Sequence, residues 1–176
     1  KELEVLNGYG VRDVTLLGQN VNSYNGTDKN GSSVNFAGLL QRIADYLKET
    51  SSSIGWVRFM SSHPKDLTDD VIDVISKNDV LCRHIHLPVQ NGSSKILSAM
   101  NRKYTREQYL DLVTRIKTAM PDVSLTTDIM MGFPGETEED VQATLDLMRQ
   151  VQYESAMMYY YNPREGTTDE KMEQIP

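Results

Sequence analysis

Two adjacent primary amides, Gln19 and Asn20, are side chains of a type that can bind a small polar ligand. They follow the apolar run 14–17, which has the length and composition of a strand. A primary amide can donate to a carboxylate and accept from an ammonium at once, and an amino-acid ligand needs that combination. A turn rich in amides that only shapes the loop up to Asn35 is the alternative, and the residue types alone favour it.

Asp128 lies within the apolar run 123–129, where an unpaired buried charge would be costly. Its carboxylate therefore either accepts hydrogen bonds from hydroxyl groups of a ligand, such as those of a ribose, or is held in a network inside the protein. Phe133 and Pro134 follow as an apolar ledge that suits stacking on adenine. Gly135 permits a tight turn before the next helix, so a well-made strand-to-helix turn is the alternative interpretation of the segment.

His84, His86 and Gln90 lie on one face of a predicted strand, because side chains alternate between the two faces of a strand. The apolar residues between them then face the helices. Two histidines separated by one residue also suit zinc in amidohydrolase barrels, but such sites need further ligands from later strands. No histidine follows His86, so we interpret the pair as hydrogen-bonding groups inside the fold.

Short apolar runs that predict strands recur along the chain, at residues 14–17, 56–60, 84–89, 123–129 and 156–161. Apolar residues with helical spacing separate them, most clearly over 36–47 and 109–116. Helix starts are predicted at Thr68, Thr105 and Thr137. This alternation predicts an α/β fold with parallel strands joined by right-handed crossovers. It leaves open whether the strands form an open sheet or part of a barrel.

The composition of the 176 residues excludes several classes of protein. Cys82 is the single cysteine, so this chain has no intrachain disulfide and cannot supply the three or four thiolates of an iron–sulfur cluster. The net charge of −7 is opposite to that of surfaces that bind nucleic-acid phosphates, so other segments would have to hold an RNA substrate. Neither a dinucleotide-binding GxGxxG nor a P-loop motif is present.

The sequence also lacks the features of a membrane protein. No apolar run approaches the roughly 20 residues that span a bilayer. The charged first residues do not have the pattern of a signal peptide. We therefore expect a cytoplasmic protein.

Four segments together resemble the radical S-adenosylmethionine (SAM) methylthiotransferases, namely residues 15–24, 87–93, 100–104 and 132–137. Within that family, the Gly-Gln-Asn-Val-Asn-Ser-Tyr run at 18–24 is most similar to the MiaB-type enzymes, which modify isopentenylated adenosine beside the tRNA anticodon. The resemblance implies a partial TIM-type barrel of parallel strands that lacks its first strand. Residues 1–176 are accordingly expected to be one fragment of the radical SAM core, without the cluster-binding loop, the N-terminal cluster domain and the C-terminal RNA-binding domain.

The resemblance also implies which side chains line the SAM site: Gln19, Asn20, Ser62, Gln90, Arg102, Asp128, Phe133 and Pro134. Gln19 or Asn20 is expected to contact the methionyl amino group of SAM. Arg102 is expected near the mouth of the site, where it pairs with a SAM carboxylate or an RNA phosphate, and the alternative is a solvated helix end. The resemblance identifies no catalytic residue here, and no metal ligand is expected.

The implied activity is the replacement of a hydrogen on an adenosine carbon by a methylthio group, with SAM and two 4Fe-4S clusters as cofactors of the full-length protein. This chain is expected to bind neither cluster and to be inactive alone. The expected partners are tRNA and an electron donor protein such as flavodoxin. We expect a monomer with no membrane association.

Three alternatives stay open at the level of sequence. Sister methylthiotransferases that act on threonylcarbamoyl-adenosine of tRNA or on a ribosomal-protein aspartate share the scaffold, although their amide pattern differs from that at 18–24. A non-catalytic tRNA-binding module is disfavoured by the net acidity. A zinc hydrolase barrel would need histidine ligands that the sequence does not provide after His86.

Overall fold

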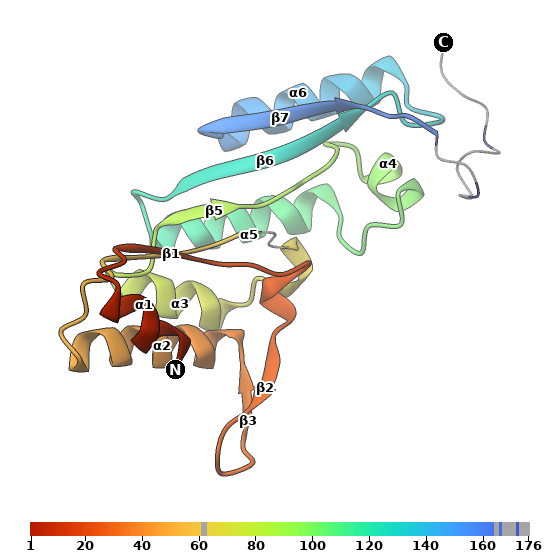
Figure 1. Ribbon diagram of the computed structural model, residues 1–176. Helices are drawn as coiled ribbons and strands as arrows, with labels where there is room; N and C mark the ends of the chain where they lie inside the picture. The colour runs from red at the N-terminus through yellow and green to blue at the C-terminus, as the bar shows by residue number, and fades with distance from the viewer. Residues whose placement is uncertain (61–62, 164–165, 167–171, 173–176) are drawn as a thin grey trace. The chain divides into compact units, whose positions relative to one another are not determined.

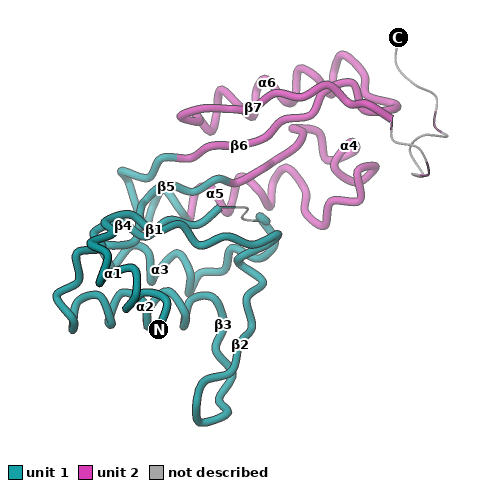
Figure 2. Tube along the Cα trace, viewed as in Figure 1, with its two compact units in different colours: residues 1–86, 116–124 teal, residues 87–115, 125–176 magenta. Residues whose placement is uncertain are grey.

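The computed structural model describes residues 1–60, 63–163, 166 and 172 of the chain. The chain forms two compact units, the first made of Lys1–His86 with Ile116–Ser124 and the second of Leu87–Arg115 with Leu125–Pro176 (Figure 2). Strands alternate with helices along the chain (Figure 1). Each unit contains a pair of parallel strands or strand segments and its own buried apolar side chains.

The sheet of the first unit is built on two parallel strands. Strand β1 (Asp13–Leu16) pairs with β4 (Trp56–Phe59), and Val14 lies opposite Val57. A further parallel bridge joins Val57 to Leu81. Parallel neighbours require a crossover connection, and the chain between β1 and β4 is long enough to contain a helix.

Three helices accompany these strands. Helix α1 (Glu2–Gly8) precedes β1, α2 (Phe36–Glu49) lies between β1 and β4 in the chain, and α3 (Asp69–Lys77) follows β4. On each of the helices α2 and α3, apolar residues at helical spacing form one buried face. The two faces together contain Phe36, Ala37, Leu40, Ile43, Ala44, Leu47, Val71, Ile72 and Ile75.

A short hairpin projects from the first unit (Figure 1). Strand β2 (Asn25–Thr27) pairs antiparallel with β3 (Ser33–Asn35). The Asp28 carboxylate holds the turn because it accepts two backbone N–H groups of that turn, each at 2.9 Å. We expected a loop in this region from the sequence. The short polar strands of the hairpin have too weak an apolar pattern to be predicted.

Short elements complete the first unit. The 3₁₀ helix η1 (Val21–Ser23) lies between β1 and β2 in the chain, and η2 (Pro64–Asp66) follows β4. In β5 (His84–His86), Ile85 is fully buried between two partly exposed histidines. The predicted alternation of faces is confirmed over this strand.

The second unit contains the parallel strands β6 (Ser124–Met131) and β7 (Ser155–Tyr160), with Asp128 opposite Met157. One face of β6 is buried, and it presents Leu125, Thr127 and Ile129. The side chains of β7 are exposed on both faces of the strand. They include Met157, Met158, Tyr159 and Tyr160.

Three helices carry the rest of the second unit: α4 (Ser94–Ala99), α5 (Arg106–Ala119) and α6 (Glu138–Val151). The last residues of α5, from Ile116, are grouped with the first unit. Figure 1 shows α6 beside the strand pair β6–β7. Leu147 and Val151 are the apolar residues of α6 that are almost completely buried.

The predicted helix starts are confirmed. Thr137 and Asp140 form a capping box, in which each side chain bonds to the backbone N–H of the other residue. Thr105 and Gln108 do the same at the start of α5, at 2.9 and 3.3 Å. Thr68 is the N-cap of α3.

Buried tyrosines join the second unit's helices to its extended backbone. Tyr109 is completely buried, and its hydroxyl donates to the carbonyl oxygen of Leu87 at 2.8 Å. The Tyr153 hydroxyl donates to that of Tyr109, also at 2.8 Å. Burial raises the pKa of both phenols because it disfavours the charged form.

Each apolar run predicted as a strand overlaps an observed strand, and the observed pairs β1–β4 and β6–β7 are parallel. The prediction of an α/β fold with parallel strands is therefore confirmed. Within the described residues, no helix has both the length and the apolar character needed to cross a membrane.

Candidate ligand-binding site beyond strand β1

The chain turns into η1 directly after the loop that follows β1. Asn20 begins this helix, and its carbonyl oxygen accepts the N–H of Ser23 at 3.2 Å. Because β1 and β4 are parallel neighbours, η1 and η2 emerge at the same edge of the sheet. The carboxyl ends of parallel strands are where α/β proteins place their ligand sites.

Three polar side chains from these two short helices form a closed hydrogen-bond network. Asn20 Nδ2 donates to Ser23 Oγ at 2.7 Å and to Asp66 Oδ2 at 2.6 Å. Ser23 Oγ in turn donates to Asp66 Oδ2 at 3.0 Å. A carboxylate can only accept, so the nitrogen of the Asn20 amide must face Asp66, and the orientation of that amide is fixed.

Next to this network, buried amide atoms have no hydrogen-bond partner among the described residues. They are Asn20 Oδ1 and both polar atoms of the Asn22 side chain. Asn22 is only 7% exposed. Each unmatched buried polar group costs roughly 1–3 kcal/mol. Native proteins rarely leave such groups unpaired, so these atoms indicate a ligand that brings its own donors and acceptors.

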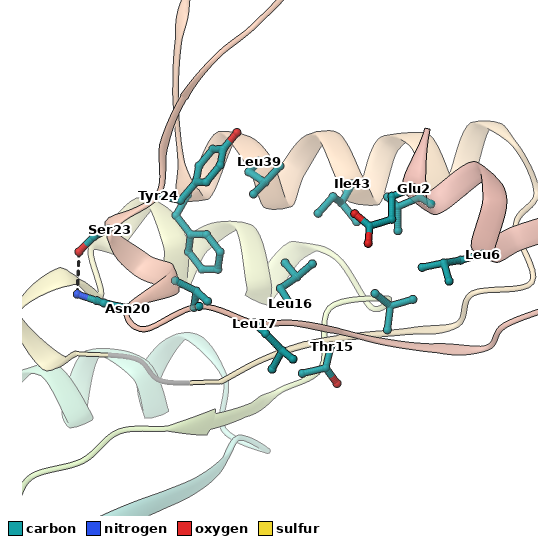
Figure 3. Close-up of a pocket in the computed structure, with 15 residues that line it drawn as sticks. Glu2, Leu6, Thr15, Leu16, Leu17, Asn20, Ser23, Tyr24, Leu39 and Ile43 are labelled. Carbon is teal, nitrogen blue, oxygen red and sulfur yellow. Dashed lines mark hydrogen bonds between the residues drawn. The ribbon is translucent and has the colours of Figure 1, made fainter.

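A pocket of about 710 Å³ extends from the same loop between β1, α1 and α2 (Figure 3). Leu16 of β1 and Leu39 and Ile43 of α2 face one another in it. Asn20 and Ser23 lie at its polar end, and the hydrogen bond between them is drawn in Figure 3. The pocket is therefore apolar along α2 and polar where η1 begins, and Glu2 of α1 adds a carboxylate to its lining.

The remaining predicted site residues of the first unit are Gln19 and Ser62. Gln19 is exposed beside Asn20. Ser62 lies outside the described residues. The neighbouring His63 accepts the backbone N–H of Lys65 through Nδ1 at 3.2 Å, which shapes the start of η2.

In the second unit, backbone hydrogen bonds bring Gln90 and Asp128 together. The N–H of Gln90 donates to the carbonyl oxygen of Asp128 at 2.9 Å, and its own carbonyl accepts from Met130 at 2.7 Å. Gln90 has a left-handed backbone with φ of 71°. Asp128 is half-buried, on the face of β6 opposite to its buried apolar residues.

Phe133 and Pro134 are both buried in the turn after β6. The ring of Phe133 makes an edge-to-face contact with Tyr161, with 5.1 Å between the ring centroids. The Glu136 carboxylate accepts from Asn91 Nδ2 at 2.6 Å and from the Gly132 N–H, which fixes the turn. Stacking of this segment on adenine stays a prediction, and the structure shows that Phe133 already packs on one aromatic ring of its own chain.

Arg102 lies in the turn after α4, half-buried. Its N–H donates to the carbonyl oxygen of Leu97 at 2.8 Å, and the preceding Asn101 has a positive φ of 57°. Burial raises the pKa of the nearby Tyr104 to about 12, against the opposing effect of the Arg102 charge. The guanidinium forms no ion pair with a described residue, and its contact with a SAM carboxylate or an RNA phosphate stays a prediction.

The segment before α4 serves the fold. Ser93 Oγ donates to Asp140 Oδ1 at 2.6 Å, and Lys95 pairs with the same carboxylate at 2.8 Å. Burial alone would raise the pKa of Asp140, but hydrogen bonds from Lys95, Ser93 and Thr137 hold that pKa well below its usual range. The Asp140 carboxylate therefore lies beside the first residues of α4.

We did not predict Asn22, Ser23 or Asp66 as site residues from the sequence. Asp66 follows the strand adjacent to β1, and the rule that ligands bind where parallel strands end applies to it as much as to Asn20. That rule was the available signal for Asp66. Burial of Asn22 has no signal in the sequence, because asparagine next to a strand end is usually exposed.

Several curated proteins with similar sequences have the same name. The chain is 56% identical to the tRNA-2-methylthio-N(6)-dimethylallyladenosine synthase of Treponema pallidum, over 95% of this chain and 36% of that protein. Proteins of the same name from Clostridium botulinum and Clostridium perfringens are 53% identical over 99% and 100% of the chain, and 38% of each relative is covered. The chain thus spans little more than a third of the relatives' length.

Solved structures share the fold at low sequence identity. The radical S-adenosylmethionine methyltransferase TsrM from Kitasatospora setae has a TM-score of 0.68 and 18% identity, over 90% of this chain and 29% of that one. Coproporphyrinogen III oxidase (HemN) from Escherichia coli has a TM-score of 0.53 and 17% identity, over 72% of this chain and 29% of that one. Identities this low show the fold alone.

The family itself is shown by a match to most of the chain. The profile of the Radical SAM superfamily covers residues 1–148, which include the strands β1 to β6. The fold is similar to that of TsrM over 90% of this chain. This chain belongs to the radical SAM superfamily.

Proposed function

We propose that this chain is part of a tRNA methylthiotransferase that adds a methylthio group to isopentenylated adenosine next to the anticodon. The observation that carries the proposal is the 53–56% identity to synthases of that nucleoside over at least 95% of the chain. The solved radical SAM proteins TsrM and OxsB share 18% and 13% with it. The high identity to the synthases supports a common substrate in addition to a common fold.

SAM matches the unpaired polar atoms beyond β1. Its methionyl ammonium is a donor for Asn20 Oδ1, and its carboxylate is an acceptor for Asn22 Nδ2. SAM brings the sulfonium group from which the family's radical chemistry starts. We propose the other contacts to SAM from the family resemblance, at Gln19, Ser62, Gln90, Arg102, Asp128, Phe133 and Pro134.

An iron–sulfur cluster does not match the residues of this chain. Cys82 is the single cysteine, and Arg58 Nη1 donates to its Sγ at 3.1 Å. In the described part of the chain, no three His, Cys, Asp or Glu side chains are grouped as metal ligands. We propose that the full-length protein holds two 4Fe-4S clusters through cysteines outside residues 1–176.

Further proposals concern the full-length protein. We propose that segments other than this acidic chain bind the tRNA, since a net charge of −7 opposes contact with phosphates. We also propose a flavodoxin-type electron donor, a monomeric state and a cytoplasmic location. Residues 1–176 then form one domain of the enzyme, the radical SAM core.

Deletion of the gene and mass spectrometry of tRNA nucleosides test the proposed function. We expect loss of methylthio-isopentenyladenosine and accumulation of its unthiolated precursor. If that nucleoside persisted while another methylthio product disappeared, the substrate would be that of a sister methylthiotransferase. If no methylthio product changed, the proposal would be wrong.

A further inference from the structure

We infer that Asp66 is a positioning residue, whose carboxylate fixes the Asn20 amide so that Oδ1 receives the ammonium group of SAM. This inference rests on the proposed function, because SAM supplies the ammonium. Asp66 itself is 2.6 Å from Asn20 Nδ2, on the opposite side of the amide from the free oxygen. It therefore acts through Asn20 and has no direct contact with the ligand.

The count of donors in the network supports this role. Both N–H groups of Asn20 Nδ2 are used, one on Ser23 and one on Asp66, and the single O–H of Ser23 is used on Asp66. Asn20 Oδ1 is the atom of the three side chains that is buried without a partner. The network can therefore take one more donor at that position and has no donor left to offer.

The charge of Asp66 makes a cationic donor the preferred one. Asp66 is half-buried and forms no ion pair with a described residue. The negative charge of Asp66 polarises the amide of Asn20 and makes Oδ1 a stronger acceptor. Hydrogen bonds in series strengthen one another in this way in a partly buried site. A neutral donor such as water would gain less from this arrangement than an ammonium group.

The geometry also explains why the partner of Asn20 is so distant in sequence. Asp66 and Asn20 are 46 residues apart, yet each lies in a short helix that follows one of two paired parallel strands. The N–H of Asp66 donates to the carbonyl oxygen of His63 at 2.9 Å, which holds η2 in place. Pairing of β1 with β4 thus brings the carboxylate to the amide.

Binding of two ligands to the full-length protein separates positioning from general stability. SAM carries the ammonium group, whereas 5′-methylthioadenosine lacks the whole amino-acid part. In Asp66→Asn, the new amide can donate to Asn20 Oδ1, so Asn20 turns and the free acceptor is lost. Isothermal titration should show SAM binding weakened about tenfold or more, as expected for a hydrogen bond to a charged group, with 5′-methylthioadenosine affinity unchanged.

Two further variants complete the experiment. Asp73→Asn removes the same charge from α3, where Asp73 pairs with the exposed Lys77 at 2.7 Å, and should leave SAM binding unchanged. In an Asn20→Ala background, Asp66→Asn should cause no additional loss, because Asp66 acts through Asn20. The melting temperature of each variant reports on folding independently of the ligand.

The inference would be overturned by any of three results. These are unchanged SAM affinity in Asp66→Asn, equal weakening of both ligands, or a further loss in the Asn20→Ala background. Failure of the unchanged protein to bind SAM would overturn it as well. Normal SAM binding together with a negative tRNA nucleoside test would instead refute the proposed function and leave the role of Asp66 intact.

Discussion

Gly92 lies where the chain before α4 touches the backbone of α6, and we predict that Gly92→Ala destabilises the protein strongly. A Cβ atom on Gly92 would be 2.6 Å from the carbonyl oxygen of Ala143 and 2.7 Å from the backbone nitrogen of Thr144. The Gly92 N–H also donates to Thr144 Oγ1 at 2.9 Å in a buried hydrogen bond. No side-chain rotation can relieve a clash with helix backbone.

The magnitude follows from the required movement. Ordinary van der Waals contact begins at 3.4 Å, so α6 has to retreat by at least about 0.8 Å from the new methyl group, and Thr144 Cα lies nearer still. A gap of this size forfeits a quarter to a half of the dispersion energy around Thr144 and the buried Leu147. Overpacking costs about 1–3 kcal/mol, and stretching of the buried hydrogen bond adds about 1 kcal/mol. We expect a loss of about 3 kcal/mol in the free energy of unfolding.

Chemical denaturation and thermal melting measure this loss. A change of 3 kcal/mol lowers the melting temperature by roughly 6–12 °C for a protein of this size. Gly55→Ala is the matched control, because a Cβ atom on Gly55 meets no atom within 4 Å and the residue has no positive φ. Equal stability of Gly92→Ala and the unchanged protein would refute the predicted contact between Gly92 and α6.

Three further predictions concern buried polar groups. Asn22→Leu removes an unmatched buried amide, so it should raise the free energy of unfolding of the ligand-free protein by about 1 kcal/mol. SAM should then no longer raise the melting temperature of the variant. A loss of stability in the ligand-free variant would contradict this. Asp140→Asn should be less stable than the unchanged protein at pH 7, and the difference should shrink as the pH falls below about 4. The reason is that the lowered pKa of Asp140 stabilises the fold above its unfolded pKa and ceases to do so at lower pH; a difference that stays constant in urea titrations from pH 7 to pH 3 would exclude it. Tyr153→Phe should lose less stability between pH 9 and pH 11, because the raised pKa of the buried Tyr153 lets the unfolded chain ionise first above about pH 10. Denaturation midpoints at both pH values test this, and an identical alkaline loss would count against it.

Local signals predicted most elements of the fold. Apolar runs of four to eight residues located the strands, and Thr105 and Thr137 located helix starts because capping depends on residues only three positions apart. The hairpin β2–β3 was not predicted, because polar strands of three residues have no apolar face to detect. The Asp28 carboxylate holds its turn through hydrogen bonds from residues two and four positions along the chain.

The candidate site was predictable in part. The amides at Gln19 and Asn20 were selected from their types and from their place after a strand, and the structure adds the free acceptor on Asn20. Asp66 was missed because its link to Asn20 depends on strand pairing across 46 residues. The burial of Phe133 against Tyr161 was missed for the same reason, as the contact joins segments on either side of α6.

The backbone conformation of Gln90 affects which residues are tolerated at position 90. A left-handed φ of 71° suits glycine, and a residue with a Cβ atom is less stable there by roughly 1 kcal/mol. Mutation to glycine at this position would therefore relieve strain, and drift under selection for stability alone would move toward it. The proposed contact between the Gln90 side chain and SAM would make residue 90 a site where stability is given up for activity.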